Sequence, residues 1–124
     1  MLGKANCLAT IAVRDLEASK KFYEKTLGLK RMHSEGDQTV SYESGESELL
    51  VYRSAFAGTN LATVATWSGE DVESVVRELK ARGVKFEHYD FPGGTRDGDV
   101  HLHGDMKAAW FKDPDGNILA IVSR

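Results

Sequence analysis

The stretch that decides the fold is residues 8–28, LATIAVRDLEASKKFYEKTLG. Residues 8–13 form a short apolar run that ends at a charge pair, which predicts a strand. Asp15 follows at the place of a helix N-cap. Apolar side chains then recur at helical spacing, at Leu16, Tyr23 and Leu27. Gly28 stands where a glycine ends a helix, so the stretch predicts a strand followed by a helix.

The same pattern returns in the second half of the chain. Asp71 lies 56 residues after Asp15, and Gly83 lies 55 residues after Gly28. Between them an apolar stripe predicts a second helix, with Ser68 expected as its N-cap. Further strands are predicted at residues 29–33, 39–42, 48–53, 62–67, 84–89, 108–111 and 118–122.

These elements predict an α+β fold of two β-α-β-β-β modules, at about residues 5–55 and 61–124 of a single domain, 1–124. We expect the modules to pair around a shared cleft. Residues 113–117, with proline, glycine and asparagine, predict a turn. Residues 91–105 are rich in glycine and are expected to be a mobile loop that closes over the cleft.

The composition excludes several classes of protein. The chain has 124 residues and is 41% hydrophobic, enough for a core of its own. The net charge of −3 argues against a nucleic-acid partner. Apolar runs are too short to span a membrane, which takes about 20 residues. The single cysteine, Cys7, cannot form an intrachain disulfide, and the composition suits the cytoplasm.

Two motifs give the chain a resemblance to a known family. They are VRDLEAS at residues 13–19, followed by Phe22-Tyr23, and WFKDPDGNI at residues 110–118. With both in this order, the chain resembles the vicinal oxygen chelate superfamily of glyoxalase, bleomycin resistance and extradiol dioxygenase-like proteins. The resemblance implies a cup-shaped mixed sheet with the helices on its outer face, and a homodimer.

The resemblance also implies four positions for metal ligands. By their distance from the motifs these are Leu8, Val64, Ala120 and Leu49, and Glu48 serves only if the strand register shifts by one residue. Apolar side chains cannot ligate a metal ion. We therefore expect no metal and no cofactor.

Without a metal, the same face becomes a mostly apolar pocket for a small organic molecule. Alternation along the strands sends Tyr52 to the opposite face, under a helix. The alternative is that the inward side chains simply fill the space as core. The predicted ligand-binding residues are Leu8, Thr10, Leu49, Val51, Arg53, Val64, Thr66, His101, His103, Trp110 and Ala120.

The histidines give a rival site. His101 and His103 lie on one face if their segment is extended, and Asp99 and Asp105 continue the spacing. With His88 from a neighbouring strand, this set would suit iron, zinc or manganese. The alternative is that these polar side chains belong to a solvent-exposed loop and bind no metal.

Three functions follow, in order of preference. The first is a metal-independent small-molecule binder in the manner of bleomycin resistance proteins. The second is an enzyme, a lyase, isomerase or dioxygenase with a relocated histidine and carboxylate site or with metal-free acid–base chemistry. The third is an accessory protein whose cleft is packed shut. The sequence leaves open whether the chain is catalytic.

Overall fold

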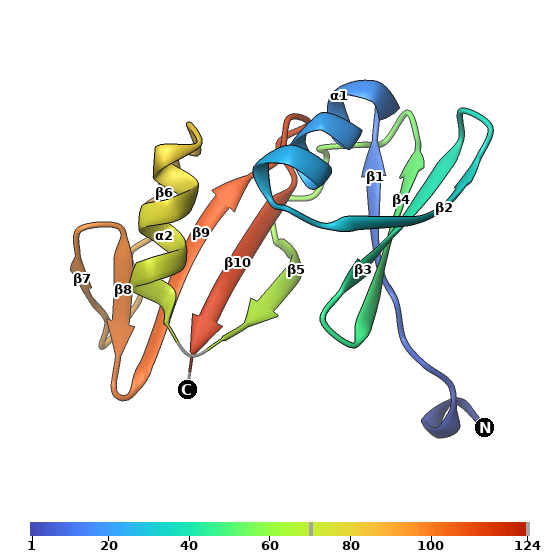
Figure 1. Cartoon of the computed structure of the whole chain (residues 1–124). Coiled ribbons are helices and arrows are strands. Elements are labelled where there is room, and N and C mark those ends of the chain that lie inside the picture. Colours follow the sequence, from blue (N-terminus) through green and yellow to red (C-terminus); the bar gives the residue numbers. More distant parts are fainter. Residues whose placement is uncertain (70, 124) are drawn as a thin grey trace. The chain divides into compact units, whose positions relative to one another are not determined.

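The computed structural model describes residues 1–69 and 71–123 (Figure 1). It has an α+β fold with a four-stranded and a six-stranded sheet, which confirms the predicted fold class. The chain divides into two compact units, Met1–Thr59 and Asn60–Arg124. Each unit has its own sheet, its own helix and its own core.

The sheet of the first unit has the strand order β1-β4-β3-β2. β1 and β4 are parallel, and the other neighbours are antiparallel. A 3₁₀ turn, η1 (Leu2–Lys4), precedes the sheet. The strands are β1 (Ala9–Val13), β2 (Lys30–Glu35), β3 (Thr39–Ser44) and β4 (Ser47–Arg53). All four lie where the sequence predicts strands.

The helix of the first unit begins as α1 (Leu16–Lys20) and continues as the π-helical segment η2 (Lys21–Thr26). Asp15 caps it, because its Oδ1 accepts hydrogen bonds from two amide N–H groups of the first turn at 3.0 and 3.2 Å. Gly28 follows with φ at 77°, a left-handed conformation that glycine adopts without a steric penalty. Both predicted helix ends are confirmed, whereas the π-helical geometry was not predicted.

This helix covers one face of its sheet. Tyr23 of η2 and Tyr42 of β3 are fully buried, and their rings stack with centroids 6.1 Å apart. The Tyr42 hydroxyl donates to Glu24 Oε2 at 2.9 Å. Burial, together with this bond, raises the pKa of Tyr42, so the hydroxyl keeps its proton. Aliphatic side chains complete the core: Ile11, Val13, Leu16, Val40, Leu49 and Val51.

The sheet of the second unit has the strand order β5-β10-β9-β8-β7, and β6 also pairs with β9. β5 and β10 are parallel, and the other pairs are antiparallel. The strands are β5 (Thr63–Ser68), β6 (Phe86–Glu87), β7 (Thr95–Asp97), β8 (Val100–His103), β9 (Met106–Lys112) and β10 (Ile118–Ser123).

The β7–β8 hairpin corrects the prediction of an irregular loop over residues 91–105. Its strands have three and four residues, too short for alternation to stand out. Gly98, with φ at 61°, makes the tight turn between them. The glycines that suggested a loop are therefore turn residues, and the module exceeds the predicted β-α-β-β-β pattern by one hairpin.

The helix of the second unit, α2 (Val72–Ala81), is capped by Asp71, whose Oδ1 accepts the Ser74 N–H at 2.9 Å. Asp71 thus repeats the role of Asp15. Ser68, predicted as the cap, is instead the last residue of β5. The strand runs further than predicted because Ser68 still pairs with Val122 of β10.

One face of the second sheet lies under α2. Lys107 of β9 forms an ion pair with Glu73 of α2, which places alternate residues of β9 beneath the helix. Phe111 and Leu119 are the fully buried large side chains of this layer. In the described part of the chain, no helix combines the length and apolar character needed to cross a membrane.

The turn at residues 113–117 is confirmed, and the buried Asp113 holds it. Asp113 Oδ1 accepts the amide N–H groups of Asp115 and Asn117, each at 2.9 Å. Its Oδ2 accepts the Asn117 side-chain amide at 2.8 Å. The carboxylate of Asp113 therefore closes a turn that joins β9 to β10.

Candidate functional site

The sheet face opposite α2, called the Trp110 face below, carries the predicted binding residues of the second unit. The register places Thr66 of β5, Ala120 of β10 and Trp110 of β9 side by side on three neighbouring strands. His101 of β8 pairs with Ala108 of β9, two residues before Trp110, and so joins this face. The prediction that residues 66, 110 and 120 share one face is confirmed.

The indole of Trp110 reaches across β10. Its Nε1 donates to Thr63 Oγ1 at 3.2 Å, and Thr63 pairs with Ile118 on the far side of that strand. A bulge at Val64 turns the Thr63 side chain to this face. Ala120, beneath this crossing, is only 2% exposed. The small alanine leaves room for the ring, so Ala120 supports Trp110 rather than offering surface to a ligand.

His101 lies among aromatic rings and is 2% exposed. Trp110 meets it edge-on with centroids 4.8 Å apart. The Tyr89 amide N–H donates to His101 Nε2 at 2.9 Å. A ring nitrogen that accepts a hydrogen bond carries no proton, so the proton of the neutral imidazole is on Nδ1. Within the described residues, Nδ1 has no hydrogen-bond partner.

Phe91 is brought over His101 by a tight turn at residues 91–94, called the Phe91 turn below. The Phe91 ring stacks on His101 with centroids 6.0 Å apart and planes 22° apart, and its centroid is 5.9 Å from that of His103. Gly94 passes so close that an added Cβ would come within 2.4 Å of the Phe91 ring. Only glycine fits beneath the ring in this arrangement.

The remaining histidine near this face, His88, is bound to a carboxylate. Its Nε2 lies 2.7 Å from Asp99 Oδ1, and Lys80 of α2 lies 2.7 Å from Asp99 Oδ2. Hydrogen bonds from Lys80 and then His88 hold the pKa of Asp99 below its usual range. Asp99 therefore ties the β7–β8 turn and the segment after β6 to the helix.

The predicted histidine and carboxylate set does not form a metal-binding group. Asp99 is engaged by Lys80 and His88, and the Phe91 ring lies against both His101 and His103. Over residues 1–69 and 71–123, no three or more histidine, cysteine or acidic side chains are arranged to hold a metal ion.

In the first unit, the register separates the predicted residues onto two faces. Ala9 pairs with Leu49 and Ile11 with Val51, which places Leu49 and Val51 in the core under α1. Thr10 pairs with Leu50 and lies on the opposite face. The prediction that Leu49 and Val51 share a face with Thr10 is wrong.

The cause of this error is a run of three apolar residues in β4, residues 49–51. In such a run, the alternation of polar and apolar residues that identifies the buried face of a strand is missing. The actual register puts Glu48 on the face of Leu8. Tyr52 also lies on that face and is 37% exposed, so its predicted place under a helix is wrong too.

A cavity of about 500 Å³ opens at Leu8, which is 41% exposed. Three glutamates, Glu43, Glu46 and Glu48, and the exposed Cys7 contribute to its wall. Apolar and acidic groups therefore meet at this end of the first sheet.

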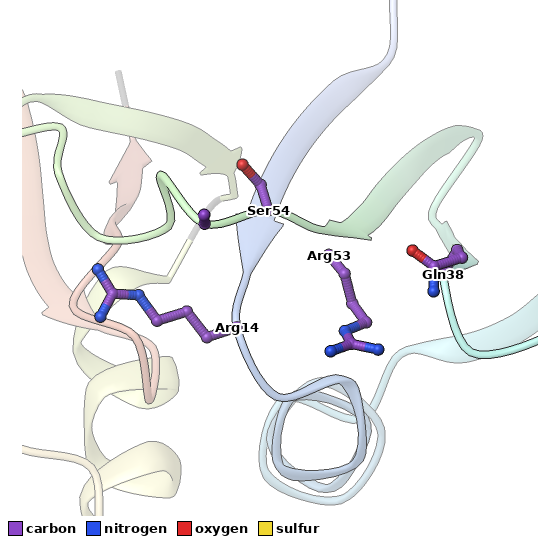
Figure 2. A pocket seen from close by; sticks show the side chains of 5 residues that line it. Arg14, Gln38, Arg53 and Ser54 are labelled. Carbon is purple, nitrogen blue, oxygen red and sulfur yellow. The ribbon is translucent and has the colours of Figure 1, made fainter.

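Arg53 lines a separate pocket of about 390 Å³ with Arg14, Gln38 and Ser54 (Figure 2). The ends of β1 and β4 pair in register, which brings both arginines to the same end of the sheet. Arg53 Nη1 lies 3.4 Å from Asp37 Oδ2, and the Gln38 amide donates to Asp37 Oδ1 at 2.8 Å. The pocket suits an anionic group, which would compete with Asp37 for Arg53.

The sequence model of the Glyoxalase/Bleomycin resistance protein/Dioxygenase superfamily matches residues 6–121. The chain belongs to this superfamily. Among curated protein sequences, none matches the chain.

Solved structures that are similar to this chain have the same fold. A lactoylglutathione lyase from Agrobacterium tumefaciens is 19% identical with a TM-score of 0.72, over 97% of this chain and 93% of that one. A glyoxalase family protein from Enterococcus faecalis is 21% identical with a TM-score of 0.72, over 98% and 99%. An antibiotic binding protein from Streptomyces sp. CB03234 is 18% identical with a TM-score of 0.65, over 97% of each chain.

The metal-ligand positions that the sequence resemblance implies hold mostly apolar residues in this chain. Leu8, Val64 and Ala120 occupy three of the four implied positions, and their side chains have no donor atom. The register places Glu48 at the fourth, beside Leu8. One carboxylate falls short of the roughly three protein ligands of a catalytic metal centre.

Sequence reasoning missed Phe91, Thr63 and Gly94. Phe91 directly precedes Pro92-Gly93-Gly94, and an aromatic residue before such a turn is a signal that could have been used. The hydrogen bond of Thr63 depends on a bulge at Val64, for which the local sequence holds no signal.

Proposed function

We propose that this superfamily member binds a small, planar, largely apolar organic molecule on the Trp110 face, without a metal ion. The observation that supports this most is the indole of Trp110, which a hydrogen bond to Thr63 holds over Ala120. Ala120 occupies one of the positions at which a metal centre of the superfamily would need a donor atom. Aromatic rings with a few hydroxyl groups are typical of small-molecule sites.

The solvent exposure of the side chains on the Trp110 face indicates which of them a ligand would contact. Thr66 is exposed, Val64 and Trp110 are half-buried, and His101 and His103 border them. Leu49 and Val51 are core residues and Ala120 is buried beneath the indole, so these three leave the predicted set of ligand contacts. Leu8 and Thr10, on the face of the first sheet opposite α1, and Arg53, in its own pocket, remain separate candidate contacts.

Binding is preferred to the alternative of a relocated metal enzyme. His101 Nε2 already accepts a hydrogen bond from the Tyr89 amide, and His88 is held by Asp99. A solved structure of the same fold, described as an antibiotic binding protein, supports binding as a role for this fold. The predicted homodimer stays a prediction, which light scattering checks.

Calorimetric titration with naphthalene, a planar apolar probe, tests the proposal. We expect saturable binding that falls at least tenfold in Trp110→Leu and in Thr66→Phe, which fills the exposed part of the face. Thr66→Phe changes no core residue, so this variant still tests the binding site if Trp110→Leu is unstable. Trp67→Phe, at the other tryptophan of the chain, is the matched control and should bind normally. Equal affinity in all four proteins would contradict the proposal.

A further inference from the structure

Two polar atoms of the aromatic cluster are buried without a hydrogen-bond partner among the described residues, His101 Nδ1 and the Tyr89 hydroxyl. Their ring centroids are 6.4 Å apart, so the two rings are neighbours within the cluster. A buried donor without an acceptor destabilises the folded state, and native proteins keep few of them. The pair therefore indicates a place where an acceptor from outside the chain is bound.

The hydrogen bond at Nε2 of His101 determines which ring nitrogen carries the proton. His101 Nε2 accepts the Tyr89 N–H at 2.9 Å, so Nδ1 carries the proton. The group that binds there must accept a hydrogen bond. A cation or a second donor would meet an N–H group and be repelled.

The Phe91 ring is carried by a turn, so we infer that it moves more easily than the rings that are held in strands. His101 and Trp110 are held in β8 and β9, whereas Phe91 sits on the turn at residues 91–94. The chain is fixed on both sides of this turn. His88 is bound to Asp99 before it, and β7 pairs with β8 after it. The turn can therefore swing while its two ends stay in place.

We propose that the Phe91 turn is a lid, and that the ligand is a planar aromatic molecule with a hydrogen-bond acceptor at its edge. The ring of the ligand enters where the Phe91 ring lies and packs against Trp110. Its acceptor atom accepts a hydrogen bond from the Nδ1–H group of His101. This inference rests on the proposed function, because it concerns the same face.

Two probes of equal shape test the acceptor. Quinoline and naphthalene are both planar bicycles, and only quinoline carries an acceptor nitrogen at its edge. In calorimetric titrations we expect quinoline to bind about tenfold more tightly, as expected when a buried donor gains its acceptor. His101→Phe keeps a ring but removes the N–H group, so it should bind the two probes equally.

The lid is tested with Phe91→Ala. With no ring to displace, both probes should bind at least threefold more tightly, and the preference for quinoline should remain. Phe56→Ala is the matched control, since Phe56 is an exposed phenylalanine of the first unit. It should change neither affinity.

A spectroscopic measurement keeps the test independent of variants that fail to fold. In ¹⁵N-labelled protein, the Nδ1–H signal of His101 should shift on adding quinoline and stay in place on adding naphthalene. If both probes bind equally in a Trp110-dependent way, this inference is wrong and the proposed function stands. If neither binds in a Trp110-dependent way, both are wrong.

Discussion

The indole Nε1 of Trp110 and the hydroxyl of Thr63 are joined by a hydrogen bond of 3.2 Å that crosses the intervening strand β10. The bond fixes the ring over Ala120 and so determines what the Trp110 face offers to a ligand. It also links the edge strand β5 to the centre of the sheet through side chains.

Replacing Thr63 by valine tests this bond, because valine has nearly the shape of threonine and lacks the hydroxyl. We expect Thr63→Val to lower the free energy of unfolding by about 1 kcal/mol and to weaken naphthalene binding several-fold. Urea unfolding measures the first effect and calorimetry the second. Thr95→Val, at an exposed position of β7, should change neither. A stable Thr63→Val protein with unchanged affinity would show that the bond does not orient the indole.

Gly94 tests the packing of the lid. An added Cβ would lie 2.4 Å from the Phe91 ring, so Gly94→Ala must push this ring away from His101. We expect a loss of stability of about 1–3 kcal/mol and altered chemical shifts at His101 and His103. Gly69→Ala is the control, because nothing lies within 4 Å of a Cβ at Gly69. An unchanged His101 spectrum in Gly94→Ala would mean that Phe91 does not rest on the imidazole in solution.

Asp99 makes the stability depend on pH. Because Lys80 and His88 hold its pKa below the usual range, its contribution is complete above an ordinary aspartate pKa of about 4 and is lost as the pH falls through the folded-state value. Asp99→Asn should therefore lower the stability at pH 7 by about 1 kcal/mol and flatten the fall in the free energy of unfolding below about pH 4. Unfolding by urea at a series of pH values measures both.

The control for Asp99 is Asp105→Asn, an exposed carboxylate with no ion pair among the described residues. It should stay within about 0.5 kcal/mol of the original protein at pH 7. If Asp99→Asn and Asp105→Asn were indistinguishable, Asp99 would not anchor the hairpin to α2.

Asp113 should prove structural rather than metal-binding. Asp113→Ala removes three hydrogen bonds of a buried turn, so we expect a loss of about 2–4 kcal/mol, and a smaller one for Asp113→Asn, which keeps one acceptor oxygen. Thermal unfolding with and without a chelator measures the effect. A chelator that destabilises the original protein as much as Asp113→Ala does would instead make this turn a cation site.

The sequence predicted the parts of this fold that depend on local chemistry. Asp15 and Asp71 recur at nearly the same distance from Gly28 and Gly83, and caps and terminal glycines act within one helical turn. The turn around Asp113 is equally local. Alternation does not determine strand faces where apolar residues follow one another. The face predicted for Leu49 failed in a run of three such residues, and residues 108–111 around Trp110 are apolar as well.

The candidate site was predictable only in part, because its decisive contacts join residues far apart in the chain. Thr63 and Trp110 are 47 residues apart, and their bond depends on a bulge. His101 and Trp110 were both predicted as site residues, but the covering Phe91 depends on how a glycine turn folds back. Tertiary packing of this kind leaves no periodic signal in the sequence.

The most direct test of metal-free binding is the affinity of tag-free, chelator-dialysed protein for naphthalene, measured by calorimetry before and after adding iron, nickel, zinc or manganese. The account predicts saturable binding in the metal-free protein and an affinity that stays within about twofold when each metal is added. Binding that appears only after a metal is restored, at about one ion per chain, would contradict it.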